Sequence, residues 1–142
     1  MTSIQKVRSI SVWIFIIPFL SVNICLFTIT HLHQILEPGI PINPTFPYLD
    51  GGVSISRTVR NFPMYLLFKP AMFITSYLLI RYWFNTKNII DSFNKDYKNT
   101  KKIVFFGIGS AVLLSIHALF LGVKFEYDIY KLFRRVVMLS FI

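Results

Sequence analysis

Three long apolar runs restrict the fold of this 142-residue chain more than any other feature. Residues 9–30 contain no charged side chain, residues 63–84 carry only Lys69 and Arg81, and residues 103–123 again carry none. A helix that crosses a bilayer needs about 20 mostly apolar residues. The sequence therefore predicts an all-α fold: a polytopic membrane helix bundle with three complete spans in a single membrane domain, residues 1–142.

A fourth apolar run begins near residue 130 and does not reach the length of a span. Behind the Arg134–Arg135 pair, residues 136–142 would add about 10 Å of helix, a third of the hydrocarbon core. We therefore expect the sequence to be a fragment, the first part of a longer protein. The alternative is a short amphipathic tail that lies in the membrane interface.

The composition favours a membrane protein and excludes several other classes. Hydrophobic residues make up 54% of the chain and charged residues 15%, against roughly 25% charged in a typical soluble domain, and the mean hydropathy is +0.59. These values exclude a disordered protein and a conventional soluble enzyme, and the single cysteine excludes a disulfide scaffold. A net charge of +9 would suggest a nucleic-acid partner in a soluble protein. Here the cations cluster at the ends of the apolar runs, so we expect membrane lipids and no nucleic acid as partners.

Lysine and arginine also predict how the helices are oriented. The loop between the second and third runs, residues 85–102, carries five lysines, and a cytoplasmic N-terminus places 8 Lys and Arg inside and 6 outside. Positive residues accumulate on the cytoplasmic side of membrane proteins. We therefore expect a multi-pass protein with its N-terminus in the cytoplasm and an external loop over residues 31–62.

The external loop combines a proline repeat with a sharp turn. Proline recurs at every third position from 38 to 47, which favours extended polyproline geometry. Asp50, Gly51 and Gly52 then form a strong turn signal. Before the second run comes a polar stretch that contains Ser54, Ser56, Arg57 and Arg60.

This polar stretch has two interpretations. In the structural one, the glycines form a turn and Asp50 pairs with Arg57 or Arg60. In the functional one, backbone N–H groups, hydroxyls and guanidinium groups bind a phosphate, because the planar arginine fork bonds phosphate bidentately. Lys69, about 9 Å inside the second span, either neutralises Asp50 or extends its ammonium outward to the same plane. The predicted lipid head-group site consists of Arg57, Arg60, Lys69, Ser54 and Ser56.

The same loop resembles that of a known family. The run Pro47-Tyr48-Leu49-Asp50-Gly51, with Arg57 and Arg60 downstream and a proline-containing second helix, resembles the DRAM-type autophagy modulators. These belong with the membrane proteins of GPI-anchor lipid remodelling and with the yeast suppressor of a phosphatidylinositol-kinase defect. The resemblance implies six spans with both termini in the cytoplasm, this chain being the first half, and it brings no agreed catalytic residues. The family's Ser-Asp-Thr-Gly run reads Leu49-Asp50-Gly51-Gly52 here.

Histidines are the candidates for chemistry inside or near the membrane. His117 lies in the middle of the third run, and an ionisable side chain inside a span is a functional candidate. Alternatively it bonds a hydroxyl of the first helix or Asn23. His31 and His33, with Glu37, could share a metal only in an extended segment, because positions two apart on a helix point away from each other. We expect interfacial histidines there, and no metal or cofactor.

No residue pattern predicts hydrolase chemistry, since the sequence shows no Ser-His-Asp, Cys-His, paired-carboxylate or Gly-x-Ser-x-Gly arrangement. We therefore expect a non-catalytic integral membrane protein that binds or organises lipids. One alternative is an accessory subunit of a larger membrane complex, with Gly107, Gly109 and Gly122 on the contact face. Another is part of a transporter or lipid-remodelling enzyme, which requires further helices and a role for His117.

Overall fold

The computed structural model describes residues 3–32, 58–59, 62–93 and 99–121, together with 129, 132, 133, 136, 137 and 139. Within these residues the long elements are the helices α1 (Ser3–Phe27), α5 (Met64–Phe93) and α6 (Thr100–Phe120). A short π-helical turn, η1 (Thr28–Leu32), continues α1. The prediction of an all-α fold is confirmed for this part of the chain.

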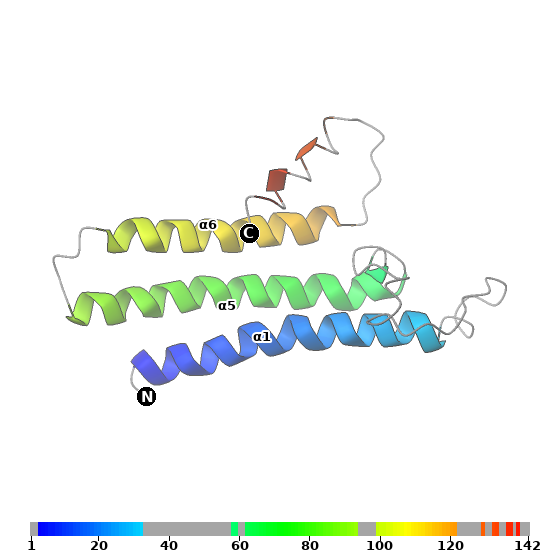
Figure 1. The fold of residues 1–142 in the computed structure, drawn as a ribbon, viewed down its shortest axis with the longest axis horizontal. Helices are drawn as coiled ribbons and strands as arrows, with labels where there is room; N and C mark the ends of the chain where they lie inside the picture. The colour runs from blue at the N-terminus through cyan, green and yellow to red at the C-terminus, as the bar shows by residue number, and fades with distance from the viewer. Residues whose placement is uncertain are drawn as a thin grey trace.

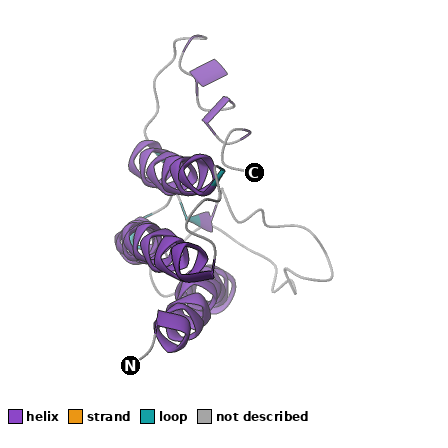
Figure 2. Cartoon of the chain, turned by 90° about the vertical axis from the view of Figure 1, so that its left-hand side faces the viewer, coloured by secondary structure: helices purple, strands orange, loops and turns teal. Residues whose placement is uncertain are grey.

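The three helices form a row. α5 packs against α1 on one side and α6 on the other, and the ribbon shows neighbouring helices running in opposite directions (Figure 1). Seen nearly end-on, the helices are stacked one above another rather than gathered into a triangle (Figure 2). The start of α1, the end of α5 and the start of α6 therefore lie at one end of the row. We call this the inner end and the opposite one the outer end, after the orientation expected from the sequence.

Each helix contains an apolar run, but the helix ends differ from the predicted span ends. α1 begins at Ser3 rather than at residue 9, and α5 continues to Phe93 rather than ending at residue 84. Polar side chains do not end a helix when they bond to its backbone: Asn85 and Thr86 donate to carbonyls one turn earlier, at 2.7 and 2.9 Å. Much of the loop expected at residues 85–102 is therefore helical.

Two described helices are long and apolar enough to cross a membrane, Ser3–Thr30 and Thr100–Phe120. α5 is longer than either but does not meet the same criterion of apolarity; its charged residues are Lys69, Arg81, Lys87 and Asp91. Most of the external loop and most of the partial fourth span expected from about residue 130 lie outside the described residues.

Large apolar side chains point outward from the helices. Phe15 on α1 exposes 67% of its surface, and Phe105 and Phe106 on α6 each expose 73%. Many of the buried positions are instead small or carry a hydroxyl: Ser21, Cys25, Thr30, Ala71, Thr75, Ser76, Gly107, Ala111 and Ala118. A soluble helical domain shows the reverse pattern, with large apolar residues inside.

An apolar cluster holds the helices together toward the outer end. It consists of Cys25, Val59, Met64, Phe68, Met72, Leu114, Ala118 and Leu121. Val59 precedes α5 and Leu121 follows α6, and the other residues come from the second half of α1, the first half of α5 and the second half of α6. The best-packed part of the structure therefore lies next to the segment that precedes α5.

Candidate functional site

Most residues of the predicted lipid site lie outside the described residues. These are Ser54, Ser56, Arg57 and Arg60, and with them the predicted turn of Asp50, Gly51 and Gly52. Lys69, His117 and the pair Thr58–Val59 are described. The structure therefore informs this site through the surroundings of Lys69 and through the packing of the two residues between the arginines.

Thr58 and Val59 are anchored at the outer end of the row. Thr58 is fully buried, and Val59 belongs to the apolar cluster with Cys25 and Met64. The Cys25 thiol donates to the Met64 carbonyl, with 3.7 Å between sulfur and oxygen. Arg57 and Arg60 flank this buried pair in the sequence.

Lys69 bridges α5 and the outer end of α6. Its Nζ donates to the Leu119 carbonyl at 3.2 Å and lies 5.7 Å from the centroid of the Tyr65 ring. Leu119 is in the last turn of α6, where carbonyls have no partner further along the helix and the helix dipole is negative. The ammonium therefore sits where a cation stabilises the end of α6, on the same end of the row as Thr58 and Val59.

His117 lies on α6, near the helix end, and is half-buried. Its Nδ1 atom is shielded from solvent. Asn23, the candidate partner named by the sequence, donates its side-chain amide to the Phe19 carbonyl of its own helix at 2.7 Å. A functional role for His117 stays a prediction.

A serine pair joins α5 and α6 in the middle of the row. Ser115 donates to Ser76 at 2.7 Å, and Ser76 donates to the Ala111 carbonyl. These two consecutive hydrogen bonds satisfy both hydroxyls between the helices, so neither hydroxyl faces the apolar exterior. Sequence reasoning missed the pair, although an antiparallel pairing of the second and third runs brings these two positions level.

Toward the inner end, α5 and α6 come close at Trp83 and Gly107. A Cβ atom added to Gly107 would overlap the Trp83 indole, whereas one added to Gly109 would meet nothing within 4 Å. The sequence predicted that glycines of this run allow a close helix contact. The structure uses Gly107 for a contact within the chain and leaves Gly109 open.

The helix segments toward the inner end carry the basic residues Lys6, Arg8, Arg81, Lys87, Lys101 and Lys102. Arg81 is the most constrained of them, with its guanidinium carbon 5.9 Å from the centroid of the Tyr77 ring and a hydrogen bond of 3.4 Å to the Tyr77 hydroxyl. Asp91 is the one acidic side chain in the described part of the chain. The inner end is thus strongly positive, and cations of this kind attract phosphate groups.

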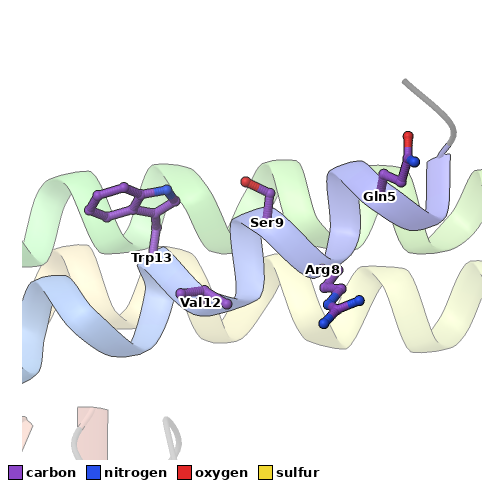
Figure 3. Close-up of a pocket in the computed structure, with 5 residues that line it drawn as sticks. All are labelled: Gln5, Arg8, Ser9, Val12 and Trp13. Carbon is purple, nitrogen blue, oxygen red and sulfur yellow. The ribbon is translucent and has the colours of Figure 1, made fainter.

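A shallow hollow of about 360 Å³ lies on one face of α1 at this end (Figure 3). Gln5, Ser9 and Trp13 form one of its walls and Arg8 and Val12 the other, each wall built from residues four apart on the helix. The polar residues lie toward the helix start and the apolar ones further along. The hollow therefore changes from polar to apolar along the helix axis.

Among the described residues, some polar groups bond two helices together, others bond the backbone of their own helix, and the charged ones are mostly positive. Within that part of the chain, no three His, Cys, Asp or Glu side chains are grouped closely enough to hold a metal ion. No match to this chain was found among models of protein families, curated proteins or solved structures. The resemblance to the DRAM-type family therefore stays a prediction that rests on its short loop motif.

Proposed function

We propose that this chain is an integral membrane protein that crosses the bilayer three times and binds anionic phospholipids. The observation that carries the proposal is the exposure of many large apolar side chains on all three helices, while many of the positions buried beside the apolar cluster are small or carry a hydroxyl. Only 22% of the apolar window in Ser3–Thr30 and 28% of that in Thr100–Phe120 is buried. A core helix of a soluble protein would be mostly buried, so hydrocarbon is the solvent that fits these surfaces.

α5 is the third span in this proposal despite its charges. Lys69 sits near the outer end and bonds to Leu119, so its charge is held close to the interface. The Arg81 guanidinium lies over the Tyr77 ring. The next two residues in the sequence, Tyr82 and Trp83, are amphipathic aromatics of the kind that gather at membrane interfaces. Between Lys69 and Arg81 no residue is charged. The remainder of α5, to Phe93, then extends into the cytoplasm.

Labelling of single cysteines tests the number of spans and the orientation together. In a Cys25→Ala background, Phe62→Cys and Asn88→Cys place one exposed thiol before α5 and one near its end. A membrane-impermeant maleimide should label position 62 on intact cells and position 88 only after permeabilisation. Labelling of both positions on the same side would contradict a spanning α5, and recovery of the protein in the supernatant without detergent would contradict membrane insertion.

The outer lipid site of this proposal consists of Arg57, Arg60, Lys69, Ser54 and Ser56. Its support is the fixed position of Thr58 and Val59, beside the two arginines, at the same end of the row as the Lys69 ammonium. Three cations brought to one membrane surface would attract the phosphate of an anionic head group.

Charge reversal tests the outer site. Arg57→Glu with Arg60→Glu should lower the amount of anionic phospholipid that copurifies per protein molecule, measured by mass spectrometry of lipid extracts. Arg57→Lys with Arg60→Lys keeps the charge and is the matched control. Unchanged lipid in the charge-reversed protein would count against the site.

An accessory subunit of a larger complex is the second candidate, and the row of helices favours it. Among the three described helices, α1 and α6 each pack mainly against α5, and Gly109 presents an open position on α6. Small residues of this kind allow close helix contacts in membranes. Purification from native membranes in mild detergent should then yield a stable complex, whereas a single monomeric species would argue against this function.

A further inference from the structure

The hollow on α1 has the polarity of one phospholipid molecule. Gln5, Arg8 and Ser9 are polar and lie nearest the inner end, and Val12 and Trp13 are apolar and lie deeper. From Gln5 to Trp13 the helix rises about 12 Å. This distance covers a head group and the first part of an acyl chain at a membrane interface.

We propose that this hollow binds one anionic phospholipid of the cytoplasmic leaflet. Its phosphate contacts the Arg8 guanidinium beside Ser9 and Gln5, and its acyl chain lies between Val12 and Trp13. The inference rests on the proposed insertion in a membrane. It adds a second lipid site, on the opposite end of the row from the cluster around Lys69.

Charge complementarity identifies the ligand as anionic. α1 contains no acidic residue, and the Arg8 side chain is exposed and forms no ion pair within the described residues. Its planar fork can give two charge-assisted hydrogen bonds to one phosphate. A zwitterionic head group also contains a phosphate, but its own ammonium cancels the charge, so an anionic head group is attracted more strongly. The other cations of the inner end add attraction for the same leaflet.

The protein leaves this face of α1 open to lipid. From Ser3 to Leu20 every residue of α1 is exposed or half-buried, and the first fully buried one is Ser21. Trp13 exposes 51% of its surface. An indole in this position has one apolar face for an acyl chain and one N–H for the head-group region, and it also reports binding by its fluorescence.

Quenching of Trp13 by brominated lipids tests the site. Trp83→Phe leaves Trp13 as the single tryptophan, and the protein is reconstituted in phosphatidylcholine vesicles that contain either dibrominated phosphatidylglycerol or dibrominated phosphatidylcholine at the same mole fraction. The anionic lipid should quench Trp13 severalfold more than the zwitterionic one. Arg8→Gln should bring the two lipids to equal quenching, whereas Lys6→Gln, the matched loss of one charge on the same helix but outside the hollow, should retain the preference.

Each other outcome has a definite meaning. An equal loss of preference in Arg8→Gln and Lys6→Gln indicates diffuse attraction to the surface and overturns the site, as does full preference in Arg8→Gln. Quenching by dibrominated phosphatidylcholine that is the same in all variants shows that the protein is in the bilayer, so the proposed function survives that failure. Lack of quenching by either lipid, with protein left outside the vesicles, contradicts the proposed function itself.

If Trp83→Phe destabilises the protein, native mass spectrometry of the otherwise unmodified chain gives the same decision. The wild-type protein and Lys6→Gln should each retain one more phosphatidylglycerol adduct than Arg8→Gln, because the outer site is unchanged in all three proteins. Equal adducts on all three proteins would overturn the site.

Discussion

The two ends of the helix row are held together in different ways. Toward the outer end, large residues such as Phe68, Met72 and Leu114 meet in a buried apolar cluster that all three helices share. Toward the inner end, α5 and α6 meet at the Trp83–Gly107 contact, and the helix segments there carry most of the described basic residues. The fold is therefore fixed mainly from the outer half, and the inner half presents charge.

α1 shows the difference within one helix. Beyond Pro18 it buries Ser21, Cys25 and Leu26, and Thr30 bonds the Leu26 carbonyl at 2.8 Å in the wider turn that follows. Before Pro18 it buries none of its described residues. A helix that is packed in one half and free in the other can hold its place in the bundle and still expose a surface to lipid or to another helix.

Truncation of a large residue in the outer cluster should have the largest effect on stability. Phe68→Ala leaves a cavity among packed residues, and we expect a loss of about 3 kcal/mol in the free energy of unfolding, at the lower end of the range for such changes. In the proposed membrane insertion the unfolded helices stay in hydrocarbon, so the transfer contribution is small and the lower value is expected. Titration of the folded protein with a denaturing detergent measures the change.

Phe15→Ala is the control for this prediction in the inner half. Phe15 is 67% exposed, and its described ring partner is Phe19, at 5.5 Å between centroids. Loss of one exposed aromatic pair should cost less than about 1 kcal/mol. Equal effects of Phe68→Ala and Phe15→Ala would mean that the outer cluster does not carry the stability of the fold.

The two glycines of α6 give the second prediction. Gly107→Ala forces the Trp83 ring to move, and overpacking of this kind costs about 1–3 kcal/mol. Gly109→Ala meets open space and should be neutral or stabilising by up to about 1 kcal/mol, because alanine favours a helix. Thermal unfolding in detergent compares the two variants.

Two further measurements test why the two glycine substitutions should differ. In a Trp83→Ala background, Gly107→Ala should lose most of its cost, because the overlapping ring is gone. If Gly109→Ala destabilises the protein purified from native membranes, then Gly109 contacts a partner, and the accessory-subunit function gains support.

The apolar runs could predict the helices because apolarity over about 20 residues is a strong local signal. They could not predict where α1 begins or where α5 ends. Lys6 and Arg8 before the first run, and the polar residues after Phe84, are compatible with a helix that continues beyond an apolar run. The span predicted over residues 63–84 stays a proposal, because the charges of α5 keep it below the apolarity at which composition alone indicates a span.

The candidate sites were less predictable than the helices. Lys69 was singled out because a charge in an apolar run is conspicuous, but its bond to Leu119 depends on a partner 50 residues away. The serine pair and the Trp83–Gly107 contact likewise join distant positions, and serine and glycine give no local signal of their partners. The hollow on α1 was missed because Arg8 was counted with the cations before the first apolar run and Trp13 was part of that run, so the two were not considered as one surface.

The serine pair should have a smaller effect than the glycines. Ser76→Ala and Ser115→Ala each remove one hydroxyl from the link between α5 and α6. Hydrogen bonds between membrane helices average about 0.6 kcal/mol of coupling. A double-mutant cycle with the same detergent titration should give a coupling of this size, and a coupling of zero would show that the two hydroxyls contribute independently.

Lys69 gives the smallest expected effect and separates the two roles proposed for this residue. Lys69→Gln removes a cation from the negative end of α6, which should cost about 0.5 kcal/mol in a neutral detergent, whereas Lys69→Arg should retain most of that stability. If Lys69 also contributes to the outer lipid site, added phosphatidylglycerol should stabilise the wild-type protein more than Lys69→Gln, and the difference between the two proteins should widen. Unfolding measured with and without this lipid decides: a constant difference would leave Lys69 as a stabiliser of the α6 end and remove it from the lipid site.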